Sequence, residues 1–264
     1  MLDAIVLAGG DPLRDTELLA HTGGNAPCKA LIELGDKTFL ERIADALLSS
    51  GRVRRIVVAG LEADRIPNLG PDVAFLPDAG SMLNNGQAGL DYFYGTGEIS
   101  ERIVVSSADV PLITPEIVRD LLDTDLQYDV DFCYNIVEKE TMEQTFPGSG
   151  RTFVRIEGKR FAGGDLNLVR PTILGDNRAK VEEIIGERKT FWKQVRAVGL
   201  GTLFLLLVGQ LTIAGVERQV GKALGFTAKA IICPHAEVAM DVDKPHHLDV
   251  VLAAWTERHR EKTV

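Results

Sequence analysis

Cysteine is scarce in this chain of 264 residues, and its few thiols are widely spaced. The three cysteines, Cys28, Cys133 and Cys233, are odd in number and form no C-x-x-C pair. This pattern argues against a disulfide framework and against a structural zinc site, and it is typical of buried thiols in a reducing compartment. We therefore expect a cytoplasmic protein, whose first residues form a strand rather than a signal peptide.

Clusters of positive charge are also missing. The 29 Lys and Arg residues are outnumbered by 38 Asp and Glu residues, which gives a net charge of −9. We therefore expect no nucleic-acid partner. A small phosphorylated ligand remains compatible with this charge, because its site needs only a few local cations and backbone N–H groups.

A long uncharged and mainly apolar run covers residues 198–216. It reaches the length of a membrane-spanning helix, but several glycines and Gln210 dilute its apolar character. We expect an apolar helical segment at about 198–224, made of buried helices. One alternative is a membrane-surface contact through 198–216, which would make the protein peripheral to the membrane. The others are a homodimer contact through the same run and a true membrane span.

In the first half of the chain, short apolar runs alternate with helix-like segments, which is typical of βαβ units. This pattern predicts strands at 3–8, 55–59, 73–76 and 102–106, and helices at 38–50, 86–94 and from 114 onward. It favours a three-layer α/β/α sandwich around a mainly parallel, twisted sheet.

The pattern loosens at about residues 129–200, which we interpret as an inserted β-rich arm on the acceptor side of a single domain, 1–264. A helix near 177–186 is expected after the strands of this arm. The remaining elements are helices at 212–224 and 245–260 and a strand at 228–233.

A glycine pair follows the first predicted strand, in the segment Leu7, Ala8, Gly9, Gly10. Glycine lets backbone N–H groups approach phosphate oxygens and form an anion-binding loop. The segment matches neither G-x-G-x-x-G nor G-x-x-x-x-G-K-[ST], and the chain has no G-x-S-x-G. A Rossmann dinucleotide site, a Walker ATPase and a serine hydrolase are therefore disfavoured.

Carboxylates occur in two further segments. Asp109 follows Ala108 at the carboxyl end of the strand predicted at 102–106, which is where open α/β sheets bind ligands. Asp241 and Asp243 lie near the C-terminus, immediately before the last predicted helix. Oxygen ligands of this kind suit a hard divalent cation such as Mg²⁺.

Together, the segment LAGGDPLR at 7–14, Lys29 with the helix that follows it, the segment DVP at 109–111 and the segment DVD at 241–243 resemble the MobA-like and sugar-phosphate nucleotidyltransferases. The resemblance implies a GT-A-like fold. It also implies transfer of a nucleoside monophosphate from an NTP, with CTP or GTP favoured, to a small acceptor. The acceptor would be a phosphomonoester, and pyrophosphate would be released. The expected cofactor is Mg²⁺, for which Mn²⁺ can substitute.

By this resemblance, Arg14 and Lys29 hold the triphosphate, and Asp109 binds the metal ion. We count these three residues as catalytic, and we expect the glycine segment to contact the nucleotide. Only one of Asp241 and Asp243 is expected to face the same metal ion as Asp109, and Asp243 is favoured.

The resemblance also predicts where the base and the acceptor bind. The base would contact a loop and helix start made of Ala79, Gly80, Ser81, Asn84, Asn85 and Gly86, with Ala108 nearby. The acceptor would contact a polar strand face made of Gly164, Asp165 and Asn167. The same arm also carries cationic candidates for an acceptor phosphate, namely Arg151, Arg155, Lys159, Arg160 and Arg170.

The chain departs from the family pattern in two places. Residues 15–28 separate Arg14 from Lys29, which predicts a longer loop over 17–27, and Lys244, His246 and His247 stand where the family has Thr, Glu and Asp. Two other functions therefore stay open. One is a glycosyltransferase of similar fold that uses a nucleotide-sugar, and the other is a noncatalytic nucleotide-binding sensor.

Overall fold

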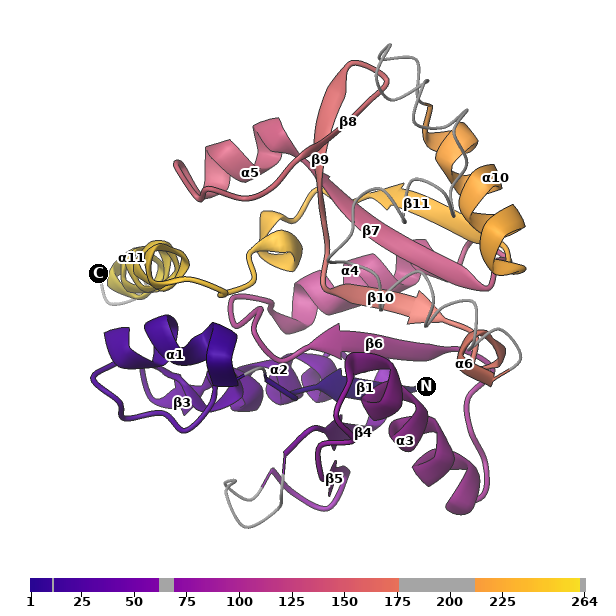
Figure 1. Ribbon diagram of the computed structural model, residues 1–264, viewed down its shortest axis with the longest axis horizontal. Helices are drawn as coiled ribbons and strands as arrows, with labels where there is room; N and C mark the ends of the chain where they lie inside the picture. The colour runs from indigo at the N-terminus through magenta and orange to yellow at the C-terminus, as the bar shows by residue number, and fades with distance from the viewer. Residues whose placement is uncertain (11, 62–68, 176–211, 262–264) are drawn as a thin grey trace.

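The computed structural model describes residues 1–10, 12–61, 69–175 and 212–261. Among these residues, nine strands form one sheet, in the order β5-β4-β1-β6-β10-β7-β9-β8, with β11 paired to β7 (Figure 1). The strands of this sheet are β1 (Leu2–Leu7), β4 (Val53–Ala59), β5 (Val73–Leu76), β6 (Ile103–Ser107), β7 (Phe132–Glu138), β8 (Val154–Ile156), β9 (Lys159–Gly163), β10 (Leu166–Val169) and β11 (Ala228–Ile232). A small antiparallel pair lies apart from it, made of β2 (Glu33–Leu34) and β3 (Lys37–Thr38).

Helices cover both faces of the sheet. The described helices are α1 (Pro12–His21), α2 (Phe39–Ser49), α3 (Met82–Gly95), α4 (Pro115–Asp125), α5 (Lys139–Thr145), α6 (Thr172–Gly175), α10 (Ile213–Leu224) and α11 (Pro245–Glu261), with short 3-10 turns η1 (Lys29–Leu31) and η3 (Ala236–Ala239). Figure 1 shows α2 and α4 behind the sheet and α3 in front of it. The predicted α/β class and its three layers are therefore confirmed.

The two hydrophobic cores follow from the alternation of side chains along each strand. In β1, Ala4 and Val6 pack into a core with α2 and α4, whereas Ile5 between them packs into a second core with Leu90 and Phe93 of α3. Because β1 is buried on both faces, its sequence is a nearly continuous apolar run.

Local capping explains where the helices begin. Thr38 and Glu41 form a reciprocal capping box at the start of α2, and Thr114 accepts a hydrogen bond from the N–H of Ile117 at the start of α4. Helix α3 begins at Met82, earlier than predicted, because the hydroxyl of Ser81 accepts the N–H of Asn84 at 3.1 Å. The predicted helices at 212–224 and 245–260 correspond to α10 and α11.

The described part of the predicted arm is continuous with the central sheet. Strand β10 pairs antiparallel with β6, and Leu166 lies opposite Ser106. Strand β7 pairs with both β10 and β11, so the sheet is mixed: β5, β4, β1 and β6 are parallel, and most of the later pairs are antiparallel.

Two predictions fall mainly outside the described residues: the helix near 177–186 and most of the apolar run at 198–216. In the part of the chain that the structure describes, no helix has both the length and the apolar character to cross a membrane. The membrane-surface and homodimer contacts therefore stay predictions.

The sheet topology creates one functional edge. Since β1, β4, β5 and β6 are parallel, their carboxyl ends lie at the same edge, where the glycine pair, Gly60, Asp78 and Asp109 follow them. Strand β10 runs the opposite way, so Asp165, just before it, lies at this edge too. Ligands bind at such edges in open α/β sheets.

Candidate active site

The glycine loop after β1 is held close to the end of β4. The N–H of Ala8 donates to the carbonyl of Ala59 at 2.8 Å. Gly60 has a φ of +108°, and a Cβ built there would lie 2.2 Å from the nitrogen of Gly9. Only glycine fits such a contact, so Gly60 is part of the loop support. Gly60 was not predicted from the sequence, although a glycine directly after a buried strand was the signal available.

The predicted base-binding loop is fixed by its own side chains. Asn85 is 2% exposed; its Oδ1 accepts the N–H of Ala79 at 2.7 Å, and its Nδ2 donates to Asp78 at 2.9 Å. Asn84 donates to the carbonyl of Ala79 at 3.0 Å. A Cβ at Gly9 would lie 2.6 Å from Asn85 Nδ2, so this amide also borders the glycine loop.

These contacts divide the predicted base contacts into two groups. Asn85 and Gly86 are buried, and Asn85 is engaged by protein partners, whereas Ala79, Gly80 and Ser81 are exposed beside the glycine loop. The residues best placed to meet a base are therefore the exposed ones of this loop.

Lys29 brings the two carboxylate motifs together. Its ammonium donates to Asp109 Oδ2 at 2.7 Å and to Asp243 Oδ1 at 2.6 Å, although these partners lie 80 and 214 residues away from it in the chain. The side chains of Lys29 and Asp109 are 17% and 11% exposed, and that of Asp243 is 52% exposed. The cluster is thus open to solvent on the side of Asp243.

Electrostatics keep Lys29 and Asp243 charged. Burial by itself would lower the pKa of Lys29, but the carboxylates of Asp109 and Asp243 outweigh it and raise this pKa well above its usual value. Burial opposes ionisation of Asp243 as well, yet the ammonium of Lys29 holds the pKa of Asp243 below its usual value. The cluster therefore places one ammonium between two carboxyl groups.

Asp109 is held from several sides. The hydroxyl of Ser107 donates to Asp109 Oδ1. The N–H of Ala108 donates to the carbonyl of Leu7 at 3.1 Å, and the N–H of Val242 donates to the carbonyl of Asp109 at 2.9 Å. The backbone of the C-terminal motif is therefore joined directly to that of Asp109. Ser107 was not among the predicted site residues.

The two C-terminal aspartates have different partners. Asp241 is 6% exposed and pairs with Arg151, whereas Asp243 pairs with Lys29. His247 accepts the N–H of Asp243 on its Nδ1 at 3.2 Å, and burial lowers the pKa of His247 to about 4, so its ring is neutral. Arg151 was predicted only as one of several cations of the arm, and no role was predicted for His247.

The predicted acceptor residues play unequal parts. Gly164 and Asn167 connect to Asn135 of β7. The N–H of Gly164 donates to the backbone carbonyl of Asn135 at 2.8 Å, and the Oδ1 of Asn167 accepts the N–H of Asn135 at 2.9 Å. Asp165 instead belongs to the charged cluster. Burial, followed by the charge of Asp109, raises the pKa of Asp165 to about 7.

Arg14 lies in α1, and its side chain is outside the described residues, so its predicted role stays a prediction. Helix α1 continues to His21, which shortens the loop predicted over 17–27. His21 pairs with Asp249 of α11 at 2.9 Å, and both helices lie at the same end of the molecule (Figure 1).

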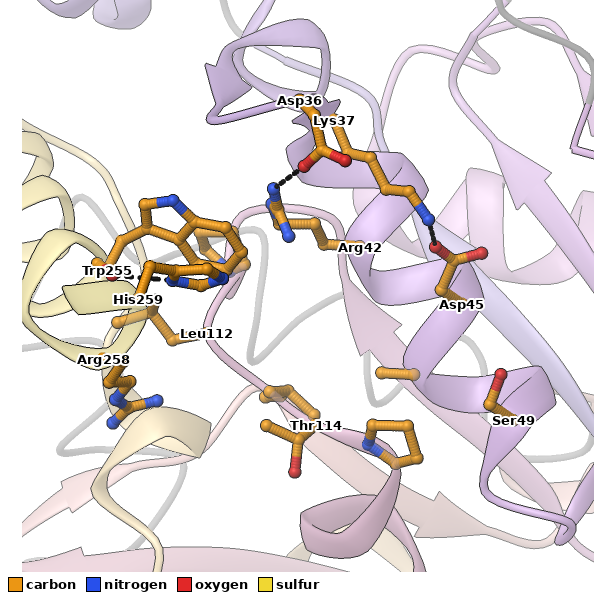
Figure 2. Close-up of a pocket in the computed structure, with 14 residues that line it drawn as sticks. Asp36, Lys37, Arg42, Asp45, Ser49, Leu112, Thr114, Trp255, Arg258 and His259 are labelled. Atoms are coloured by element: carbon orange, nitrogen blue, oxygen red, sulfur yellow. Dashed lines mark hydrogen bonds and ion pairs between the residues drawn. The ribbon is translucent and has the colours of Figure 1, made fainter. Parts of the chain in front are cut away.

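A cavity of about 600 Å³ has none of the residues of this cluster in its lining. It is bordered by α2, the loop 111–115 and the end of α11 (Figure 2). Arg42 lies 3.6 Å from the centre of the Trp255 ring, and His259 stacks on that ring. Figure 2 also shows Arg42 paired with Asp36 and Lys37 paired with Asp45, so these cations already have partners.

The residues present fit a divalent cation. The ammonium of Lys29 shows that one positive group can meet oxygens of Asp109 and Asp243 at the same time. Two protein carboxylates, completed by phosphate oxygens, are a common donor set for Mg²⁺ in phosphoryl-transfer sites. The described residues contain no group of three or more His, Cys, Asp or Glu side chains that could form a complete protein cage.

Comparison with known proteins bears directly on this site. The model of the MobA-like NTP transferase domain matches residues 4–169, which is more than half of the chain. The chain belongs to this family. It is therefore a nucleotidyltransferase, and the expected recognition is confirmed. No curated protein is significantly similar to it in sequence.

Solved structures agree with this nucleotidyltransferase fold. A hypothetical transferase from Thermus thermophilus is 30% identical, with a TM-score of 0.79 over 94% of this chain and 99% of the other. A CMP:2-keto-3-deoxy-manno-octonic acid synthetase complexed with CTP is 12% identical, with a TM-score of 0.58 over 97% and 98%. The 2-C-methyl-D-erythritol 4-phosphate cytidylyltransferase from Thermus thermophilus is 14% identical, with a TM-score of 0.54 over 97% and 100%. At these low identities the last two show the fold alone.

Proposed function

We propose that this nucleotidyltransferase transfers a nucleoside monophosphate from an NTP to a small phosphomonoester acceptor and releases pyrophosphate. The observation that carries the proposal is the contact of Lys29 with both Asp109 and Asp243, at the sheet edge that also holds the glycine loop. This edge combines backbone N–H groups that can bind phosphates, the ammonium of Lys29 and two carboxylates.

The residues have separate tasks in this proposal. Gly9, Gly10 and Lys29 bind the triphosphate, and Arg14 assists them. An acceptor oxygen attacks the α-phosphorus in line, so that a new P–O bond forms while the bond to pyrophosphate breaks. Lys29 stabilises the charge that develops on the leaving group. A phosphate acceptor is already deprotonated, so its attack needs no general base.

Asp109 and Asp243 would hold the divalent cation, Mg²⁺ or Mn²⁺. The cation would supply charge neutralisation at the phosphate oxygens. Because Lys29 carries a positive charge between the same two carboxylates, it must shift from at least one of them when another cation binds there. The flexible stem of lysine permits this shift, and it would bring the ammonium towards the triphosphate.

Two structural neighbours support CTP as the first nucleotide to test, since one was solved with CTP and the other is a cytidylyltransferase. GTP is the second. The exposed residues Ala79, Gly80 and Ser81 are the predicted contacts for the base edge, because hydrogen bonds from a fixed loop can distinguish bases.

The deciding experiment combines two measurements on the whole protein. Thermal-shift assays with CTP, GTP, UTP and ATP in the presence of Mg²⁺ identify the nucleotide, because a ligand that binds the native state raises its melting temperature. Pyrophosphate release is then measured against a panel of phosphorylated sugars, polyols and alcohols. The proposal expects stabilisation by one NTP and pyrophosphate release that depends on one class of acceptor.

Other outcomes would favour the competing functions. Stabilisation by a nucleotide-sugar and by none of the four NTPs would contradict the proposal and favour a glycosyltransferase. Tight NTP binding without release of pyrophosphate for any acceptor would favour a noncatalytic sensor. Asp36→Asn is a suitable control in each assay, because Asp36 is an exposed carboxylate away from the charged cluster.

A further inference from the structure

We infer that Arg151 is a positioning residue that determines which of Asp241 and Asp243 takes part in the cation site. The inference rests on the proposed function, since it concerns how the same site is assembled. It adds a residue from the segment before β8, which neither the family match nor the motifs assign to this task.

Local backbone geometry alone would not separate the two aspartates. In an extended chain, residues two apart point to the same side, so Asp241 and Asp243 could both approach one cation. The structure separates them by their partners. Asp241 is 6% exposed and lies against Arg151, while the side chain of Asp243 is 52% exposed and lies on Lys29.

The guanidinium of Arg151 holds both the side chain and the backbone of Asp241. Its Nη2 donates to Asp241 Oδ1, and its Nη1 donates to the carbonyl oxygen of Asp241 at 3.2 Å. A planar guanidinium can hold two acceptors in a fixed relative orientation, which a lysine cannot do. Arg151 therefore fixes the direction in which the chain leaves Asp241.

The next two residues are fixed by other partners. The N–H of Val242 donates to the carbonyl of Asp109 at 2.9 Å, and the N–H of Asp243 donates to His247 Nδ1 at 3.2 Å. Three consecutive residues thus have three separate anchors. The anchors of Val242 and Asp243 named here hold backbone N–H groups, whereas Arg151 also engages the carboxylate of Asp241 and so neutralises a charge that would otherwise compete for the cation.

The environment of Arg151 also supports a role beyond its own hydrogen bonding. Its Nε is buried and has no hydrogen-bond partner within the described part of the chain. Because an unpaired buried donor is unfavourable, the hydrogen bonds of Arg151 do not by themselves account for its position. Arg151 also lies near Asp165 and Asp243, whose ionisation it favours, so its charge offsets a locally acidic cluster.

The test is a Mn²⁺ titration followed by electron paramagnetic resonance, without nucleotide. The variants are Arg151→Gln, Asp241→Asn and the double variant, with Arg218→Gln on the exposed face of α10 as the matched control. We expect Arg151→Gln to raise the Mn²⁺ affinity by at least about threefold, because Asp241 becomes an additional ligand. Adding Asp241→Asn should return the affinity to the wild-type value, and the control should match the wild type.

A purely structural Arg151 predicts a different result. If Arg151→Gln and the double variant both bind Mn²⁺ like the wild type, or if Asp241→Asn does not reverse the change, the inference is wrong and the proposed function is unaffected. If the wild type binds no Mn²⁺, the inference fails, whereas the proposed function is tested separately by pyrophosphate release. If circular dichroism shows that Arg151→Gln does not fold, the two single aspartate variants decide. The inference then expects Asp243→Asn to weaken Mn²⁺ binding and Asp241→Asn to leave it unchanged. Equal losses of Mn²⁺ affinity in the two variants would overturn it.

Discussion

The two ends of β1 differ in the ratio of positively to negatively charged side chains. At the amino end, Asp3 is completely buried, and one of its oxygens accepts hydrogen bonds from Arg54 and Arg55, each at 2.8 Å. The N–H of Ser100 donates to its other oxygen at 2.8 Å. At the carboxyl end, one ammonium, that of Lys29, is shared by two carboxylates.

This difference separates a structural ion pair from a binding site. Two cations and a backbone N–H satisfy Asp3, so nothing further can bind there. The cluster at Lys29 has acid in excess and is open at Asp243, so an additional cation would lower its free energy. A buried charge with all its partners stabilises the fold, whereas one that lacks a counter-charge marks a site for a ligand.

The strongest test of this comparison is Asp109→Asn. We expect pyrophosphate release to fall by about 10³-fold, because one of the two cation ligands is lost, while the fold is retained. Steady-state rates and circular dichroism check both statements. An unchanged rate would mean that the carboxyl end of β1 is no more functional than the amino end.

The second test is Asp3→Ala. Removing this carboxylate leaves Arg54 and Arg55 partly buried without their partner, and we expect the free energy of unfolding to fall by roughly 2–4 kcal/mol. Urea denaturation measures the loss. The rate per folded molecule should match that of the wild type, and a specific loss of turnover would contradict a purely structural role.

The pH dependence of stability sharpens the same prediction. Burial by itself would raise the pKa of Asp3, but hydrogen bonds from Arg54, Arg55 and Ser100 outweigh it and hold this pKa well below the usual 3.8. The stabilisation is therefore present above pH 3.8 and is lost as the pH falls below it. The difference in unfolding free energy between wild type and Asp3→Ala should shrink accordingly in acid.

A smaller effect is expected from Lys29→Met in a metal-binding assay. Without the ammonium, a divalent cation no longer competes for Asp109 and Asp243, so Mn²⁺ should bind about tenfold more tightly in the absence of nucleotide, which equals about 1.4 kcal/mol. Turnover should nevertheless decrease, since the triphosphate loses a cation. Weaker Mn²⁺ binding would show that Lys29 supports the cation site instead of occupying it.

The smallest effect is expected from Arg52→Gln. Arg52 and Asp123 form an exposed pair at 2.6 Å, with side chains 40% and 45% exposed. Water screens such pairs, so the melting temperature should stay within about 2 °C of the wild type. A larger shift would mean that exposure is a poor guide to which ion pairs stabilise this fold.

The sequence by itself determined the local parts of this protein. Apolar runs in β1, β4 and β6 specify strands buried on both faces, and Thr38 and Thr114 specify helix starts, because each signal acts within a few residues. The glycine pair and Asp109 could be placed at a ligand-binding edge for the same reason, since both follow a predicted strand directly.

The tertiary structure alone decided how distant groups combine. Arg151 and Asp241 are 90 residues apart, and Lys29 and Asp243 are 214 apart, so no local pattern relates them. The placement of β10 between β6 and β7 brings Asp165 to the site, and the turn after β4 brings Gly60 against Gly9. Sequence periodicity encodes which side of a strand or helix is apolar, whereas the choice of charge partner depends on which segments the folded chain brings together.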